Sequence, residues 1–367
     1  MTAIGSEESF LSAAEGFKTS LGGWVERMAA GLEPGRFRYC QHRRLAPATG
    51  HRAQFVTCFA VKTACNTGLW NEWSAERREG AIAFIRSFQL PDGRFVDRAM
   101  HRRFALGAAF DRLRHPRATL PDEEASINAE TRQSAATLLD VGVMPAHRLP
   151  ETHADPESVR QFVRSLDWNV PWGAGSHTSH LIFFLHVNAK HGGANVVDPR
   201  IDAAFEELDR VRDPRSGTWL TGDVATQMRI NGAMKVLTAY RWTGRPLEYA
   251  DRLLDTALDA TFAEDGCSFL NRLFVVQQAV RHCGDYRRDD VRALAARSFE
   301  RVRAFHRDDG GFSFYTTRAQ RRYFGAYVSL GGVQSDMHGA TMLTWAIAIS
   351  LELLGLSQRA GWRPTAP

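Results

Sequence analysis

The sequence predicts an all-α protein, a single α/α toroid in which helical hairpins form a ring and the inner helices run parallel. Apolar residues recur at helical spacing over most of the chain, and no stretch alternates with period two long enough to need a sheet. A short glycine-containing phrase also returns along the chain, from Trp168 onward at intervals of roughly 45 to 50 residues. A closed ring of helices would use nearly all of the 367 residues.

The repeated phrase joins a small turn to an aromatic residue. Its copies are Asp92-Gly93-Arg94-Phe95, Ser216-Gly217-Thr218-Trp219, Asp265-Gly266-Cys267-Ser268-Phe269 and Asp309-Gly310-Gly311-Phe312, with Asp167-Trp168 as a degenerate copy. Glycine readily adopts the positive φ that ends a helix and reverses the chain. Each copy is therefore expected to mark a turn between helices.

Helices are expected between these turns, and Ser74 is placed to cap the first of them. Segments 177–188 and 335–354 are apolar almost all round, which suits inner helices, whereas 288–306 is amphipathic and suits an outer one. The predicted ranges are 75–89, 128–141, 156–166, 176–188, 201–211, 223–242, 248–262, 268–282, 288–306 and 335–354.

The prediction divides the chain into three parts. Residues 1–70 form a helical N-terminal lead-in, 71–357 form the toroid domain, and 358–367 form a flexible tail.

Composition narrows the class of protein. The net charge is +5 and the acidic and basic residues are mixed, which favours a solvated surface over a nucleic-acid-binding face. Five cysteines without CxxC spacing indicate reduced thiols in a cytoplasmic protein. The N-terminal segment carries the acidic residues Glu7 and Glu8 before any apolar run, so it does not resemble a signal peptide. The apolar stretch 340–354 is short for a membrane span. We expect a cytoplasmic protein without a transmembrane segment, whose partner is a small-molecule substrate; the oligomeric state is not indicated.

The segment Gln89-Leu90-Pro91-Asp92-Gly93-Arg94-Phe95 and its later copies resemble the Gln-Trp repeat of the terpenoid cyclase and protein prenyltransferase superfamily, whose members form α/α toroids. The likeness covers most of residues 75–355. It implies an enzyme that cyclises or transfers an isoprenoid diphosphate in a central cavity. The Asp-x-Asp-Asp acid of protonating cyclases and the Asp-Asp-x-x-Asp magnesium motif are absent, since Asp289-Asp290 lacks the spaced partner.

Three predicted inner helices begin with sequences that could bind an anion, at 173–177, 221–223 and 334–338. Unpaired amides and the helix dipole favour a diphosphate or carboxylate at such ends, although ordinary N-capping explains each motif as well. Asp336 and His338 would then donate and accept protons in the reaction, and Asp223 is a second candidate acid.

A polar stripe on one predicted helix is the clearest candidate for substrate binding. Gln227, Asn231 and Lys235 follow one another at four-residue spacing in an otherwise apolar segment, with Arg229 nearby. Such a stripe faces either a cavity or solvent. If it faces a cavity, Lys235 and Arg229 could hold the diphosphate.

Two further groups of residues could contact a substrate. His177 and His180 share a helix face and are candidate acids or bases, with Trp168 and Trp172 just upstream as an aromatic lining. Phe312 and Tyr323 belong to a late aromatic segment, and aromatic faces stabilise carbocations or stack on sugars. Packing in the core is the alternative for both groups.

A zinc site is also suggested by resemblance. Asp265-Gly266-Cys267 is similar to the Asp-Gly-Cys segment that supplies two zinc ligands in the protein farnesyltransferase β subunit, and His338 lies where the third ligand would fall. Carboxylate, thiolate and imidazole with one open position suit catalytic zinc. The alternative is that Asp265 and Gly266 only form another copy of the turn.

Two other classes of protein remain open. A carbohydrate-active toroid enzyme, a lyase, hydrolase or epimerase on a uronic or other sugar, would use His177, His180, Tyr323 and Arg229, with Asp223 and Asp336 as its carboxylate pair. A binding scaffold of helical repeats is less favoured, because its polar residues would lie on an exposed concave face.

Overall fold

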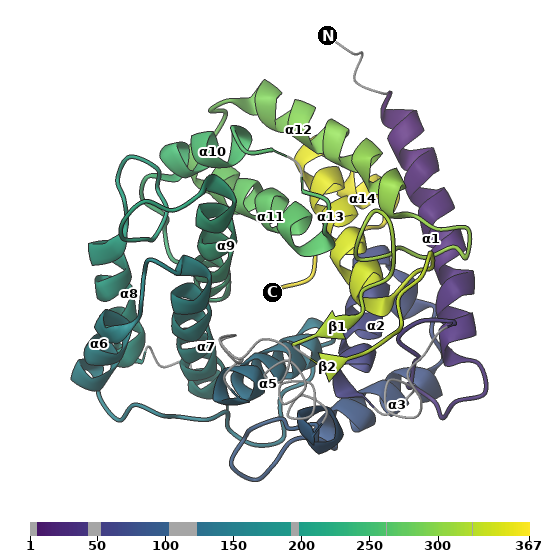
Figure 1. Cartoon of the computed structure of the whole chain (residues 1–367), viewed down its shortest axis with the longest axis horizontal. Coiled ribbons are helices and arrows are strands. Elements are labelled where there is room, and N and C mark those ends of the chain that lie inside the picture. The colour runs from purple at the N-terminus through teal and green to yellow at the C-terminus, as the bar shows by residue number, and fades with distance from the viewer. Residues whose placement is uncertain (1–5, 43–52, 103–122, 192–197, 262, 325) are drawn as a thin grey trace. The chain divides into compact units, whose positions relative to one another are not determined.

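The computed structural model is mostly helical, with 63% helix and 4% strand, which confirms the predicted all-α class. It describes residues 6–42, 53–102, 123–191, 198–261, 263–324 and 326–367. The chain forms two compact units, coloured along the sequence in Figure 1. The arrangement of the helices into a closed ring stays a prediction.

Unit 1 comprises residues 1–146, 264–267 and 295–365. Within these ranges the described part of the chain forms α1 (Glu7–Ala29), α2 (Gln54–Thr67), the 3-10 turn η1 (Leu69–Asn71), α3 (Ala75–Arg86), α5 (Glu123–Asp140), the 3-10 turn η2 (Val302–Phe305), the short strands β1 (Arg322–Tyr323) and β2 (Ala326–Tyr327), α13 (Met337–Leu354) and α14 (Ser357–Ala360). The strands β1 and β2 pair antiparallel.

Helices α2 and α13 form the core of unit 1. Every residue of α2 is buried, and the two helices are joined by a hydrogen bond between the hydroxyls of Thr63 and Thr341 at 3.1 Å. Thr341 also donates to the backbone carbonyl of Phe59 at 2.9 Å. Residues 54–67 are therefore a central core element, so the division that placed them in an N-terminal lead-in was wrong.

Helix α13 is long and apolar enough to cross a membrane, and it is the one helix of the described residues that meets this criterion. However, 83% of its apolar window is buried inside the structure. The core helix of a folded domain has the same composition, because it is covered on all sides. Its length and apolarity are thus weak evidence for a membrane span.

The C-terminal segment is packed against unit 1, which corrects the expectation of a flexible tail from residue 358. Trp362 is buried, and Asn66 of α2 accepts a hydrogen bond from Arg363 N to its backbone carbonyl and from Thr365 N to its side chain. Arg359 forms ion pairs with Glu7 and Glu8 at the start of α1. The aromatic anchor and these bonds hold the segment in place.

Unit 2 comprises residues 147–263, 268–294 and 366–367. Its helices α7 and α9 pack closely, because Gly232 lies where any larger side chain would meet Pro171. The helices of this unit are α6 (Pro156–Ser165), α7 (Pro171–Lys190), α8 (Pro199–Val211), α9 (Thr226–Thr243), α10 (Ala250–Leu258), most of α11 (Gly266–Cys283) and the first half of α12 (Arg288–Arg301).

Three copies of the repeated phrase form the same small turn. In each, an antiparallel bridge closes the turn, between Gln89 and Phe95, Arg212 and Trp219, and His306 and Phe312. The glycines Gly93, Gly217 and Gly310 have positive φ, and the three aromatic residues are completely buried. The phrase is thus a structural repeat that anchors each turn by one aromatic side chain.

The copy at Asp265 differs from the other three. The sequence left open that Asp265 and Gly266 only form another such turn, and the structure does not bear this out. Gly266 begins α11, and its backbone N–H donates to the carbonyl of Phe314 at 2.8 Å. A Cβ at Gly266 would lie 3.1 Å from Leu343 and 3.2 Å from Met342, so glycine permits the start of α11 to approach α13 closely. This approach places Cys267 beside α13.

We predict that Gly217→Ala lowers the free energy of unfolding by about 3 kcal/mol or more, because both backbone strain and steric overlap oppose it. Gly217 has φ +69°, and an added Cβ would lie 2.6 Å from the carbonyl oxygen of Tyr249. Gly142→Ala is the matched control, since Gly142 has φ +77° and nothing within 4 Å of the added Cβ. Chemical denaturation measures both variants, and equal losses of stability would contradict the prediction.

Candidate functional site

Asp336 organises the polar interior of unit 1. It caps α13, where its Oδ1 accepts from Gly339 N at 2.8 Å, and its Oδ2 accepts from Phe314 N at 2.9 Å and Gln320 N at 3.0 Å. Tyr39 donates its hydroxyl to Oδ1 at 3.2 Å. Burial raises the pKa of Asp336 to about 6, while these hydrogen bonds act in the opposite direction. One carboxyl group therefore ties three other segments to the start of α13.

The predicted role of Asp336 as an acid that contacts the substrate does not fit this geometry. Its side chain has no exposed surface, and both oxygens accept hydrogen bonds from the protein. The amides at this helix start are also occupied, since Met337 N donates to the carbonyl of Tyr39 at 2.8 Å. Asp336 is a positioning residue, and the expected anion site at 334–338 does not form.

His338 lies between two aromatic rings. Its imidazole stacks on Phe59 with ring centroids 4.6 Å apart and on Phe314 at the same distance. The ring of Tyr323 is nearly perpendicular to the imidazole, with centroids 5.3 Å apart. Nδ1 is 2.7 Å from Oε1 of Gln320, which shares the single hydroxyl proton of Tyr39 with Oδ1 of Asp336, at 3.0 and 3.2 Å respectively. With the amide in this orientation, Nδ1 carries the ring proton and Nε2 presents its lone pair.

Cys267 completes the group on the Nε2 side of the imidazole. Its Sγ lies 3.8 Å from Nε2 of His338, within reach of a thiol hydrogen bond. Cys267 is the second residue of α11, and the partial positive charge at the amino end of a helix favours a thiolate there. Cysteine, histidine and an orienting amide are the parts of an activated thiol.

The three predicted zinc ligands are not brought together as a set. Cys267 and His338 are in contact, but no group of three or more His, Cys, Asp and Glu residues that could hold a metal occurs among the described residues. The backbone of Asp265 forms an isolated bridge with Tyr315. The predicted zinc site at Asp265, Cys267 and His338 is therefore incomplete.

The structure separates the two late aromatic residues that were predicted to contact a substrate. Tyr323 stacks on Phe55 at 4.4 Å and donates its hydroxyl to Gln133 at 2.8 Å, so it belongs to the surroundings of His338. Phe312 is completely buried and packs against Phe17 and His306 as the anchor of its turn. The prediction that Phe312 contacts a substrate is therefore wrong.

The polar stripe on α9 is present in unit 2 and is joined into a network. Gln227 donates to Asn231 at 3.0 Å, and Asn271 of α11 donates to the same oxygen at 2.9 Å. Lys235 lies 5.4 Å above the ring of Trp172, which is 43% exposed. The stripe thus combines an amide network, a cation and an exposed indole.

Arg229 and Asp223 do not extend this stripe. Arg229 turns back to the start of its own helix, where it bonds the carbonyl of Val224 and forms an ion pair with Asp223. The side chain of Asp223 is fully exposed and precedes α9, which begins only at Thr226. An exposed carboxylate paired with arginine is a poor general acid, so the catalytic role of Asp223 and the anion site at 221–223 are not supported.

The histidines and tryptophan upstream are placed differently from the prediction. Helix α7 begins at Pro171, so the amides of 175–177 lie within the helix and His177 and His180 are not at its first turn. His180 is buried and stacks on Phe184. Trp168 is buried and donates its Nε1–H to the carbonyl of Val163 at 3.2 Å, which indicates a structural role.

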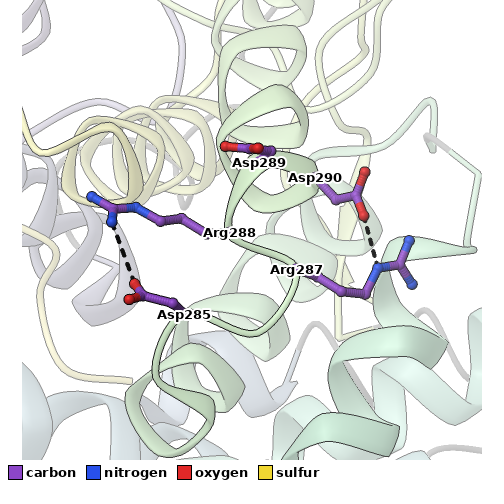
Figure 2. A pocket seen from close by; sticks show the side chains of 5 residues that line it. All are labelled: Asp285, Arg287, Arg288, Asp289 and Asp290. Carbon is purple, nitrogen blue, oxygen red and sulfur yellow. Dashed lines mark hydrogen bonds and ion pairs between the residues drawn. The ribbon is translucent and has the colours of Figure 1, made fainter.

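A charged surface hollow lies at the junction of α11 and α12 (Figure 2). Arg287 forms an ion pair with Asp290, and Arg288 lies 3.4 Å from Asp285 (Figure 2). Arg287 also forms an ion pair with Asp255. Both arginines are therefore paired with carboxylates. Asp289 and Asp290 lie in the first turn of α12, where acidic residues stabilise a helix.

The chain was compared with known proteins. No protein-family model, curated protein or solved structure matches it. The resemblance to the terpenoid cyclase and prenyltransferase superfamily accordingly stays a prediction. Of the residues that form the site around His338, the sequence did not indicate Tyr39, Phe59 and Gln320, because their roles depend on contacts between distant segments.

We predict that Cys267, which is partly exposed, reacts faster with iodoacetamide at pH 7.5 than Cys283 or the three buried cysteines Cys40, Cys58 and Cys65. Burial raises the pKa of Cys58 to about 11, of Cys65 to about 12 and of Cys283 to about 11, so these thiols stay protonated until the pH approaches those values. Peptide mass spectrometry measures the rate at each cysteine.

The same experiment tests the contact with His338. His338→Asn should slow alkylation of Cys267 by about 10-fold, because the imidazole no longer accepts the thiol proton. His306→Asn, which replaces a half-buried histidine of unit 1, is the control. Alkylation of Cys283 at the rate of Cys267 in the wild-type protein would contradict the assignment.

Proposed function

We propose that this protein is an enzyme that acts on an isoprenoid diphosphate, or a comparably apolar substrate, and that His338 accepts a proton during the reaction. The observation that carries the proposal is the clamped imidazole, with Phe59 and Phe314 on its faces, Gln320 at Nδ1 and Cys267 at Nε2. A base held in a fixed tautomer among aromatic rings suits proton transfer in a site that excludes water.

The aromatic surroundings support the choice of substrate. Phe55, Phe59, Phe314 and Tyr323 contact one another or His338, and their π faces attract positive charge. A carbocation formed from an isoprenoid would be stabilised by these faces, and a neutral imidazole could remove a proton from the carbon next to it. Cyclisation ends with this step, in which the C–H electrons form a double bond and Nε2 takes the proton.

The other residues of the group prepare His338 for this role. Gln320 keeps the proton on Nδ1 and stabilises the imidazolium when Nε2 is protonated. Tyr39 and Asp336 hold Gln320, through its side chain and its backbone respectively. The Cys267 thiol lies 3.8 Å from Nε2 and can exchange a proton with it. Prenyl transfer would use the same pair, with the imidazole, or Cys267 as its thiolate, taking the proton that the acceptor group loses when the new bond forms.

An action on sugars is the second candidate, and it rests on a separate observation in unit 2. The exposed ring of Trp172 offers a stacking surface, and Lys235 lies over that ring beside the amides of Gln227 and Asn231. A sugar with a carboxylate would match an indole, an ammonium group and amide donors. The histidines His177 and His180 are on the neighbouring helix α7.

We predict that the purified protein converts at least one of geranyl, farnesyl and geranylgeranyl diphosphate. His338→Asn should lower the turnover by about 100-fold or more, because removal of a general base typically costs this much. His177→Asn, on α7 of unit 2, is the control and should keep the activity. Products are measured by gas chromatography with mass spectrometry. Equal turnover in the two variants, or no conversion of any of the three, would contradict the proposal.

A further inference from the structure

Helix α5 presents two polar side chains whose donors are buried and unsatisfied. Nη1 of Arg132 and Nε2 of Gln133 are both inaccessible to solvent, and neither has a hydrogen-bond partner among the described residues. Buried donors without partners are rare in folded proteins and usually indicate a ligand or water that completes them. Two of them on adjacent residues make this part of α5 unusual.

The positive charge of Arg132 is not balanced by the acidic residue that interacts with it. Asp140 attracts the guanidinium, but its carboxylate is 2.7 Å from the ammonium of Lys62, in a pair whose side chains are 6% and 8% exposed. Glu130, two residues before Arg132, is 3.0 Å from Nε2 of His101. Burial lowers the pKa of Arg132, although a guanidinium remains protonated at neutral pH.

Tyr323 connects Arg132 and Gln133 to the group around His338. Its hydroxyl donates to Oε1 of Gln133 at 2.8 Å, which leaves Nε2 of the same amide available as a donor. The guanidinium of Arg132 is close enough to Tyr323 for each to affect the pKa of the other. The ring of Tyr323 contacts His338 in a T-shaped arrangement, and its stacking on Phe55 fixes the ring. All of these residues belong to unit 1.

We propose that Arg132 and Gln133 form the recognition site for an anionic group of the substrate, namely phosphate or carboxylate oxygens. The guanidinium provides parallel donors that match such oxygens, and the Gln133 amide adds a neutral donor beside them. The proposal rests on the proposed function in that it places the anionic group next to the aromatic surroundings of His338. A diphosphate or a sugar carboxylate would supply the same chemistry.

Isothermal titration calorimetry at pH 7.5 with inorganic diphosphate and with glucuronate tests the site. The wild-type protein should bind one of the two, and the one that binds distinguishes a diphosphate substrate from a sugar acid. Arg132→Gln should weaken that binding by at least 10-fold, and Arg132→Lys should weaken it less, since it keeps the charge. Arg215→Gln is the control, because Arg215 is 91% exposed in unit 2.

Thermal unfolding without ligand separates recognition from a structural role. Arg132→Gln should unfold at the wild-type temperature or higher, because it removes a buried charge that no described carboxylate pairs with. A lower unfolding temperature would overturn the proposal, as would unchanged anion binding in Arg132→Gln or the absence of binding in the wild-type protein. The His338→Asn variant should still bind the anion. Anion binding and turnover therefore test the two proposals separately, because this variant should lose turnover alone.

Discussion

The carboxyl group of Asp336 is the constraint on which the candidate site depends. It accepts a hydrogen bond from the backbone N–H of Gln320, whose side chain contacts Nδ1 of His338, and it caps the helix that carries His338. The imidazole and its partner at Nδ1 are therefore fixed by the same carboxyl group. It also binds the amide of Phe314, whose ring covers one face of the imidazole. Without this acceptor, several buried donors would lose their partner at about 1–3 kcal/mol each, and the elements of the site would no longer share a reference point.

The remaining contacts of the site follow from close packing around α13. Gly266 lets the start of α11 approach this helix, which puts the thiol of Cys267 next to Nε2 of His338. Helix α2, buried along its whole length, supplies Phe55 and Phe59. In such a dry environment hydrogen bonds and charge interactions are stronger than in water. This combination of a fixed imidazole, a nearby thiol and aromatic faces is the basis for the proposed proton transfer on an apolar substrate.

Local patterns in the sequence predicted local structure well. The helices and the turns at Gly93, Gly217 and Gly310 were predictable because periodicity and glycine conformation are properties of neighbouring residues. Asp223 and Phe312 were misassigned because a sequence does not show whether a side chain is covered. The resemblance predicted that Cys267 and His338 lie in one site. The roles of Gln320 and Arg132 could not be predicted, since they depend on contacts with segments far away in the chain.

The central claim is that Asp336 and Gln320 hold His338 with its proton on Nδ1 and its lone pair on Nε2. Nitrogen-15 chemical shifts of the imidazole, measured by NMR at pH 7.5, report this directly. The account predicts the Nδ1–H tautomer in the wild-type protein and a mixture of tautomers in Asp336→Asn, in which Gln320 is no longer held. An Nε2–H tautomer in the wild-type protein, or the same single tautomer in both proteins, would contradict it.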